Sequence, residues 1–461
     1  MCRHAGRIAG ALLAYERYCR GPTPARYLLV VAAMLGGLLS KATVVALPAL
    51  LAVLDVWPLG RVRLPGLPAA TLTANQPARY SPASWRLACG EKLPLLGLSA
   101  LFVAVTIATQ AETIHAETGL PLFSARVPNA IVATATYLVE TAWPYGLHPV
   151  HPHPGLAGIR PAAVLASGLG LLSLVALATA VARRVPAVPA GLAWFLLALS
   201  PVLGVVKQHG FQARADRFTY LAHVGLFIAI TWACARLADI VALPRRWRLA
   251  AVVIVAMWFI AIDQRQIALW RNPDTLWSGV LVIEPDNHVA IATQAVGRLN
   301  RGDCAGAERG FRRTLALAPH FPEAHYNLGV TLVRQQRYEE AVAAFRAAVH
   351  DNPRDAAALA NLGGCHARAG RWGEATAELH TAVGLDGSLV SARLNLAACL
   401  LETGAAAEAL EQARAVLDRQ PDNAAARQLA ARCTSRSIKP PPGGEPGASG
   451  SGTAGSDDAR K

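Results

Sequence analysis

A polar segment, Lys207–Leu221, holds the side chains of this sequence that are best suited to bind a charged ligand. It lies between two long apolar segments and contains Lys207, His209, Arg214, Asp216 and Arg217. Charges this close to hydrocarbon are costly unless they lie at the water boundary or serve a site. Arginine binds anionic groups in a bidentate geometry, so Arg214 and Arg217 are candidate anion contacts. Asp216 would orient one of them or accept a hydroxyl. The alternative is a local Asp216–Arg217 ion pair that holds the loop against lipid headgroups.

Lys41 is another candidate anion contact, in the middle of the apolar stretch Tyr27–Trp57. A continuous helix of about 30 residues would exceed the roughly 20 residues that cross a bilayer. Both flanks of the stretch are basic, which favours a hairpin of two shortened helices with Ser40 and Lys41 near its outer tip. The N-terminal end of the second helix would then help Lys41 to bind an anion. The alternative is one tilted span in which Lys41 extends to the interface.

The composition is typical of a membrane protein. With 461 residues, 53% of them hydrophobic and 16% charged, the chain is too apolar for a soluble protein of this size. Its formal charge of +14 comes from basic residues in short loops between apolar runs, as the positive-inside rule expects. We therefore expect membrane lipid around the chain and no nucleic-acid partner. The eight cysteines show no CxxC or metal-ligand spacing, so they predict neither a metal site nor disulfides.

The apolar segments predict a multi-pass membrane domain over residues 1–269. When the segments alternate in direction, all strongly basic short loops fall on one side of the membrane. The expected spans after the hairpin are 93–109, 162–182, 188–206, 218–238 and 249–262, with 129–143 lying in the interface. This topology places Lys207–Leu221 and everything after Asp263 outside the cytoplasm. We expect an integral protein of a bacterial cytoplasmic membrane.

Two further groups of polar residues lie on the predicted outer side. Glu140, in the interfacial segment, is expected to be a solvated carboxylate and not a base. His148, His151 and His153 include a His-x-His spacing that suits metal binding, but no carboxylate or cysteine lies near them in the sequence. The three histidines are therefore expected in a loop packed on the external face, and no metal ligands are assigned.

The second half of the sequence repeats every 34 residues, the length of one helix–turn–helix unit. A small alanine recurs where two helices approach, a large apolar residue follows four positions later, and a proline ends the unit. Such units bury their apolar faces only against their neighbours and stack into a solenoid. The structural positions of the repeats are occupied by Ala307, Ala341, Ala375, Ala409, Phe311, Phe345, Gly329, Gly363, Pro319, Pro353 and Pro421.

Four repeat units are expected over residues 288–433, with a protein or peptide bound on their concave face. Residues 270–287, which include Trp270, Pro273, Asp274 and Trp277, would form a packed elbow before the first repeat. Residues 434–461 are rich in Pro, Gly and Ser and are expected to be disordered. The predicted fold class is all-α: a polytopic transmembrane helical domain, an α-solenoid and a disordered tail.

The repeat pattern resembles the tetratricopeptide repeat (TPR). Before the repeats, the sequence contains LLSKATVVALPALLAVLDVWPLGR, EKLPLLGLSA, ADRFTYL and LWRNPDTLW, in that order. These segments resemble bacterial TPR membrane proteins, which are similar to the transmembrane and TPR-containing O-mannosyltransferases of the GT-C glycosyltransferase class. The resemblance implies a polyprenyl-phosphate-sugar as donor, with Lys41, Arg214, Arg217 and Asp216 near its phosphate, and an acceptor outside the cytoplasm.

The family's general base is an acidic residue in a first external loop, often in an acidic pair, and no such pair precedes residue 60 here. The resemblance therefore implies a chain without the N-terminal part of the family or a non-catalytic relative, and no catalytic residue is assigned. Two functions stay open. One is a glycosyltransferase-like protein whose repeats position the acceptor. The other is a membrane-anchored scaffold that recruits proteins for envelope or polysaccharide assembly. A transporter is disfavoured because the sequence has no inverted repeats.

Overall fold

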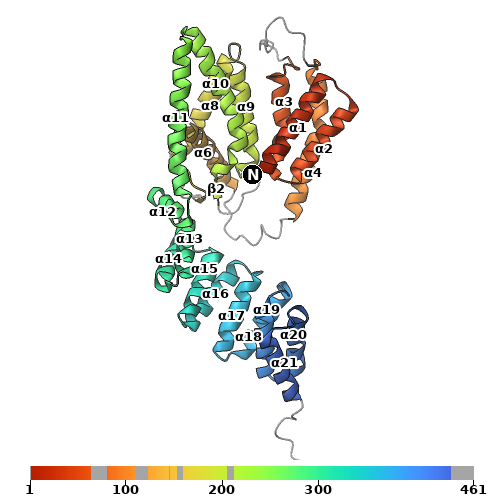
Figure 1. Ribbon diagram of the computed structural model, residues 1–461, viewed down its shortest axis with the longest axis vertical. Helices are drawn as coiled ribbons and strands as arrows, with labels where there is room; N and C mark the ends of the chain where they lie inside the picture. Colours follow the sequence, from red (N-terminus) through yellow and green to blue (C-terminus); the bar gives the residue numbers. More distant parts are fainter. Residues whose placement is uncertain are drawn as a thin grey trace, which may run out of the picture. The chain divides into compact units, whose positions relative to one another are not determined.

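The computed structural model describes residues 2–63, 80–109, 123–144, 146–152, 159–204 and 212–437. Lys207, His209, His153 and the tail from residue 438 lie outside the described residues, as does the side chain of Arg217. The described elements are helices apart from two short strands, which confirms the predicted all-α class (Figure 1). The chain forms two compact units, Met1–Ala324 and His325–Lys461.

The N-terminal unit begins with helices packed around one hydrophobic core. These are α1 (Cys2–Arg20), α2 (Pro24–Leu38), the 3-10 helix η1 (Ala42–Ala46), α3 (Leu47–Val56) and α4 (Trp85–Thr109). The core includes the buried side chains of Tyr15, Met34, Leu51 and Leu95. All four are large apolar or aromatic side chains, so their burial is the main force that holds this group of helices together.

The predicted hairpin at Lys41 is present. The chain turns between α2 and η1, and Lys41 is the residue that precedes η1. Tyr27 at the start of α2 donates a hydrogen bond to the Glu91 carbonyl, and Arg61, just after α3, pairs with the Glu91 carboxylate. The start of the first helix and the end of the second therefore lie together, so a single tilted span is ruled out.

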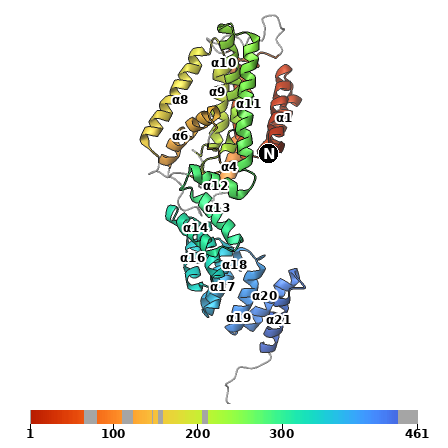
Figure 2. The ribbon, with the colours of Figure 1, turned by 60° about the vertical axis from the view of Figure 1, so that its left-hand side comes forward.

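A second group of helices follows in the same unit. It consists of α6 (Phe123–Ala142), α8 (Pro161–Val181), α9 (Ala187–Leu199), η2 (Ser200–Val202), α10 (Tyr220–Ile240) and α11 (Arg245–Leu269). Helices α9 and α10 approach closely because both carry glycine at their contact. A Cβ atom at Gly225 would come within 2.5 Å of the Trp194 ring, and one at Gly191 would overlap the Gly225 carbonyl oxygen. Figures 1 and 2 show α6 beside α8, in agreement with their contacts.

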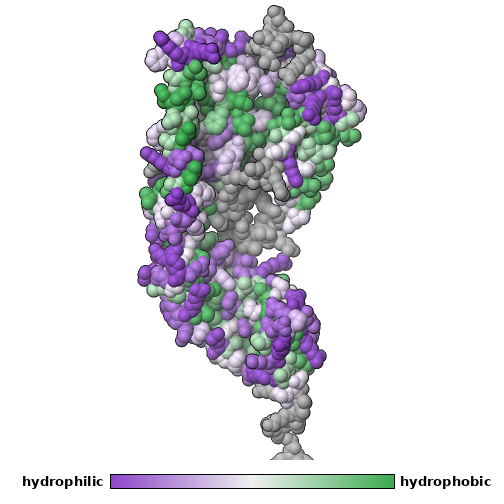
Figure 3. All heavy atoms as spheres, viewed as in Figure 1, coloured by the Kyte–Doolittle hydropathy of each residue, from purple (hydrophilic) through white to green (hydrophobic). Residues whose placement is uncertain are grey.

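Among the described residues, four helices of the N-terminal unit, α4, α8, α10 and α11, are long and apolar enough to cross a membrane. Helix α11 has no buried residue, and its Val252, Ile254 and Met257 side chains are 66%, 68% and 60% exposed. Figure 3 shows hydrophobic side chains on the outside of the helices of this unit. A helix at the surface of a soluble protein keeps its apolar side against a core, whereas these helices present it outward.

Two short strands form an antiparallel ribbon at the end of the unit where α10 begins. β1 (His151–Pro152) pairs with β2 (Gln212–Arg214), and His151 lies opposite Arg214 in the register. The short 3-10 helix η3 (Asp216–Phe218) then leads into α10. This ribbon was not predicted, because the Pro-rich segment around His151 has no strand periodicity.

The last helices of the N-terminal unit are α12 (Pro273–Ile283), α13 (His288–Asn300) and α14 (Cys304–Leu317). Asn272 caps α12 by accepting a hydrogen bond from the Thr275 amide, and Asn287 caps α13 in the same way at Ala290. Ala307 and Phe311 are fully buried on α14, as the repeat pattern predicts.

The C-terminal unit continues the repeats with α15 (Pro322–Arg334) from His325 onward, α16 (Tyr338–Asp351), α17 (Ala356–Arg368), α18 (Trp372–Leu385), α19 (Val390–Glu402), α20 (Ala406–Arg419) and α21 (Ala424–Ser437). Ala341, Ala375 and Ala409 are fully buried, and so is Phe345. A Cβ atom at Gly329 would come within 2.8 Å of the Phe345 ring, which explains why a glycine occurs there.

Candidate functional site

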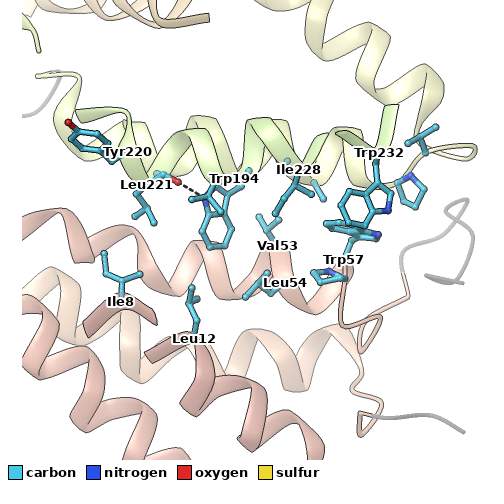
Figure 4. Close-up of a pocket in the computed structure, with 18 of the residues that line it drawn as sticks. Ile8, Leu12, Val53, Leu54, Trp57, Trp194, Tyr220, Leu221, Ile228 and Trp232 are labelled. Atoms are coloured by element: carbon cyan, nitrogen blue, oxygen red, sulfur yellow. Dashed lines mark hydrogen bonds between the residues drawn. The ribbon is translucent and has the colours of Figure 1, made fainter. Parts of the chain in front are cut away.

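A long crevice runs between the two groups of helices in the N-terminal unit. Its volume is about 1210 Å³, and its walls come from α1 and α3 on one side and from α9 and α10 on the other. The wall residues labelled in Figure 4 are Ile8, Leu12, Val53, Leu54, Trp57, Trp194, Tyr220, Leu221, Ile228 and Trp232. Trp194 donates a hydrogen bond from its indole nitrogen to the Leu221 carbonyl at 2.8 Å, so its polar atom is satisfied and its ring faces the crevice.

The two ends of the crevice differ. Lys41 and Tyr220 lie at the end where α9 finishes and α10 begins, and η1 contacts η2 there. The opposite end has Arg184, Arg236 and Asp239, beside an edge-to-face pair of Trp57 and Trp232 with ring centroids 5.5 Å apart. From Tyr220 to Asp239 the helix rises about 28 Å, close to the hydrocarbon thickness of a bilayer.

The shape and lining of this crevice suit a long apolar chain that ends in an anion. The walls are mainly aliphatic and aromatic side chains, and Lys41 is exposed at one end. An apolar chain that moves from water into the crevice buries its surface against these walls. Burial of apolar surface is the main source of affinity in such sites. The ammonium group of Lys41 would offset the cost of holding a phosphate near the chain's end.

Of the predicted phosphate contacts whose side chains the structure describes, Lys41, Arg214 and Asp216, only Lys41 lines the crevice. Arg214 on β2 donates a hydrogen bond to the Glu140 carboxylate, and it also lies 4.0 Å from Asp216. Asp216 contacts the His151 ring at 3.2 Å. A phosphate at Arg214 would have to displace Glu140, so the geometry favours Lys41 as the anion contact.

Glu140 differs from the prediction of a solvated carboxylate. Its side chain is 12% exposed and pairs with Arg214. Burial raises the pKa of Glu140, while Arg214 acts in the opposite direction. Nearby, the Tyr137 hydroxyl donates to the Ala215 carbonyl and accepts from the Ala215 amide, at 3.1 and 2.9 Å. Helix α6 therefore holds the β2 segment through both a salt bridge and a pair of hydrogen bonds, which the sequence did not reveal.

His148 and His151 form a compact cluster with a carboxylate distant in sequence. Their ring centroids lie 3.7 Å apart with the ring planes tilted by 37°, and the Glu284 Oε1 atom lies 3.2 Å from a nitrogen of each ring. Burial opposes protonation of His151, but its hydrogen bonds with Asp216 and Glu284 outweigh burial and raise its pKa. Burial also opposes ionisation of Glu284, but the two imidazoles lower its pKa. The sequence reasoning missed this cluster because Glu284 is 133 positions from His151.

A second buried polar cluster lies near the other end of the unit, and no residue of it was singled out from the sequence as a site. The Asp55 carboxylate accepts hydrogen bonds from Tyr15, Arg61 and Lys92. Arg61 also pairs with Glu91. Two cations and two carboxylates balance in charge, so we interpret the cluster as structural.

In the C-terminal unit, His366 lies against Glu378. The His366 ring is completely buried, and its Nδ1 atom is 2.8 Å from the Glu378 Oε2 atom, although the two are not aligned as a hydrogen bond. Burial and the neighbouring Glu374 raise the pKa of Glu378 to about 7. Burial lowers the pKa of His366, so both groups of this contact are shifted toward their neutral forms.

Comparisons with known proteins identify the repeats. Residues 293–353 and 329–388 match one family model described as tetratricopeptide repeat, and residues 366–433 match a second model with the same description. The C-terminal part of the chain therefore contains TPR repeats, a class that serves in protein–protein interaction. A search of curated proteins found no match to this chain.

Several solved structures are similar to the repeats. YrrB, a TPR protein with an unusual peptide-binding site, is 22% identical, with coverage of 35% of this chain and 84% of its own and a TM-score of 0.34. The first TPR of Spaghetti (RPAP3) bound to an HSP90 peptide is 19% identical, with 26% and 94% coverage and a TM-score of 0.25. A Thermobaculum terrenum O-GlcNAc transferase mutant is 25% identical, with 29% and 26% coverage and a TM-score of 0.27.

Proposed function

We propose that this chain is a multi-pass membrane protein that binds a polyprenyl-phosphate-linked sugar in the crevice and a protein or peptide on its TPR repeats. The observation that carries the proposal is the apolar crevice with Lys41 at one end. In the proposed complex, the polyprenyl chain lies between α1–α3 and α9–α10. The phosphate lies beside Lys41, and the sugar points toward the end of the unit that holds the ribbon.

Insertion in a membrane is the first part of the proposal. It is supported by the bare apolar surface of α11 and by α8, which buries only Ala178. In water such a surface would cost roughly 25 cal/mol per Å² of exposed apolar area. Cell membranes washed with alkaline carbonate should retain the protein, and its release into the wash would contradict insertion.

Alkaline phosphatase fused after Asn423 should be active, because we place the repeats outside the cytoplasm. Activity of a cytoplasmic reporter at the same position would contradict that orientation.

Lipid binding is the second part. The purified chain in detergent should bind polyprenyl phosphate, measured by native mass spectrometry, and Lys41→Gln should weaken binding about tenfold, the loss of one charge-assisted contact. Arg236→Gln is the matched control, because it also lines the crevice but at the opposite end. Equal loss in both variants would mean that the phosphate is not held at Lys41.

Sugar transfer would be a further property of the same site. Inverting transfer needs a carboxylate that activates the acceptor. Among the described residues that line the crevice, the only carboxylate is Asp239, which lies at the end opposite Lys41 and pairs with Arg248. The geometry therefore supports donor binding more strongly than transfer by these residues alone.

A scaffold without catalysis is the second candidate function. It is favoured by the TPR repeats, which match family models over 293–433. In that case the repeats should capture the same protein partner whether or not the crevice binds lipid. Complementation of a deletion strain by the Lys41→Gln variant would separate the two candidates, because only the scaffold predicts that cellular function survives the loss of lipid binding.

A further inference from the structure

The cluster of His148, His151 and Glu284 is built like a metal site. All three side chains offer ligand atoms that lie within 4.8 Å of one another. We propose that His148, His151 and Glu284 bind one divalent transition-metal ion of the zinc type. The proposal is independent of lipid binding, because none of these residues lines the crevice.

The distances between ligand atoms fit a small tetrahedral ion. Glu284 Oε1 lies 3.2 Å from His148 Nε2 and 3.2 Å from His151 Nδ1. Zinc holds nitrogen and oxygen ligands at about 2.0–2.1 Å, so neighbouring ligands of a tetrahedral site are about 3.3 Å apart. The two distances to Glu284 Oε1 thus match two edges of such a site, and the two nitrogens lie within 4.8 Å of each other. Water would take the fourth position.

Within the described part of the chain, no hydrogen bond explains the burial of His148. Its side chain is 2% exposed, and neither ring nitrogen makes a hydrogen bond with a described residue. A buried imidazole without hydrogen bonds is costly. Protonation of both histidines would place two cations in rings whose centroids are 3.7 Å apart, which is unfavourable. One metal ion bound to two neutral imidazoles satisfies both rings and neutralises Glu284.

The residues around the three ligands hold them in the required orientation. His151 Nε2 lies 3.2 Å from Asp216 Oδ1, an arrangement in which this nitrogen carries the proton and Nδ1 is free to bind metal. Glu284 Oε2 accepts a hydrogen bond from Asn287 at 2.8 Å, which leaves Oε1 for the metal. Asn287 also donates to the Val150 carbonyl, so the same side chain anchors the His148–His151 segment.

A metal here would join segments far apart in the sequence. His148 and His151 belong to the loop that forms β1, whereas Glu284 ends α12 just before the first repeat helix, α13. Neither segment belongs to the helices long enough to cross a membrane. The ion would fix the start of the repeats to the ribbon, and through Asp216 to the entry of α10.

Metal analysis of the full-length chain tests this proposal. The chain would carry an affinity tag without histidine, be loaded with zinc in detergent, dialysed, and measured by mass spectrometry of the elements. We expect about one zinc ion per chain, and background levels for His148→Ala and for Glu284→Gln. His350→Ala is the matched control, because His350 is 81% exposed, and it should retain the metal.

Two further measurements keep the test decisive if a variant folds poorly. Cobalt added to the unsubstituted chain should give the visible absorption bands of a tetrahedral nitrogen and oxygen site, a readout that needs no mutation. Asp216→Asn should weaken zinc binding about 10- to 100-fold in competition with a chelating dye, since it changes only a residue behind a ligand. A folded unsubstituted chain that holds neither ion, or a folded His148→Ala chain that holds zinc equally well, would overturn the proposal.

Discussion

Gly225 of α10 lies directly against Trp194 of α9, so closely that a Cβ atom at Gly225 would come within 2.5 Å of the indole. Both residues line the crevice. Gly225→Ala should therefore separate the two helices and destabilise the protein by about 1–3 kcal/mol, as overpacking does. Thermal unfolding in detergent measures this effect. Gly170→Ala on α8 is the control, because nothing lies within 4 Å of its added methyl group. Equal melting temperatures for the two variants would contradict the packing account.

Asp55 is the shared acceptor of the buried cluster near Arg61. Replacement by Asn would leave Arg61 and Lys92 buried with one carboxylate fewer, at a cost of about 3–5 kcal/mol. Chemical denaturation should show the loss as a lower midpoint. Asp239→Asn removes only an ion pair whose side chains are 39% and 53% exposed, so it should change stability by less than about 0.5 kcal/mol. A similar small effect for Asp55→Asn would show that the cluster does not stabilise the helices.

Gly329 gives a corresponding prediction for the TPR repeats. A methyl group there would come within 2.8 Å of the Phe345 ring, which is fully buried and has no room to move. Gly329→Ala should lower stability by about 1–3 kcal/mol. Gly384→Ala, with nothing within 4 Å, should be neutral or stabilising by up to about 1 kcal/mol through helix propensity. The rate at which a protease cleaves the repeats in the full chain would measure both variants. Faster cleavage of Gly384→Ala than of Gly329→Ala would contradict the assignment of these positions.

The stability of the repeats should depend on pH because of Glu378. Burial and Glu374 raise its pKa from 4.5 to about 7, with His366, Arg346 and Arg371 also facing it. The folded state binds this proton more tightly than the unfolded state. The contribution of this proton to the stability of the folded state is therefore complete below about pH 4.5, and it is lost as the pH rises to about 7.

The Glu378→Gln variant tests the sign of this effect. It should be more stable than the unsubstituted chain above pH 7, by on the order of 1–3 kcal/mol, and the difference should shrink toward pH 4.5. Unfolding midpoints at several pH values measure it. A difference that grows as the pH falls would show that the ionised carboxylate is the stabilising form.

The repeats were predictable in detail because their pattern is local. Each unit needs a small residue at a helix contact, so Ala341 and Ala375 recur at fixed intervals and are fully buried in the structure. The turn at Lys41 was predictable for a similar reason, since basic flanks and bilayer thickness restrict how far one helix extends. Helix ends were less accurate. Helix α4 begins at Trp85, eight residues before the predicted start, because polar Glu91 and Lys92 are satisfied by partners from α1 and the α3–α4 connection.

The candidate sites were only partly predictable, because their residues meet through the tertiary fold. Lys41 was identified from its apolar surroundings. The Arg214–Glu140 ion pair was missed, because the partners are separated by 74 positions and come together only when β2 packs on α6. Glu284 was likewise not predicted as a ligand, because it lies 133 positions from His151. The crevice itself lies between two helix groups. No periodicity in the sequence encodes how these groups are placed relative to each other.

Photo-cross-linking would show whether the crevice holds a lipid phosphate. A photoreactive amino acid in place of Ile228, which lines the crevice, is compared with one in place of Ile254, which is 68% exposed on α11. The chain is placed in a bilayer that contains a trace of labelled polyprenyl phosphate. We predict strong labelling from position 228, reduced by Lys41→Gln and by unlabelled polyprenyl phosphate, and weak labelling from position 254. Equal labelling from both positions, insensitive to Lys41→Gln, would contradict lipid-phosphate binding in the crevice.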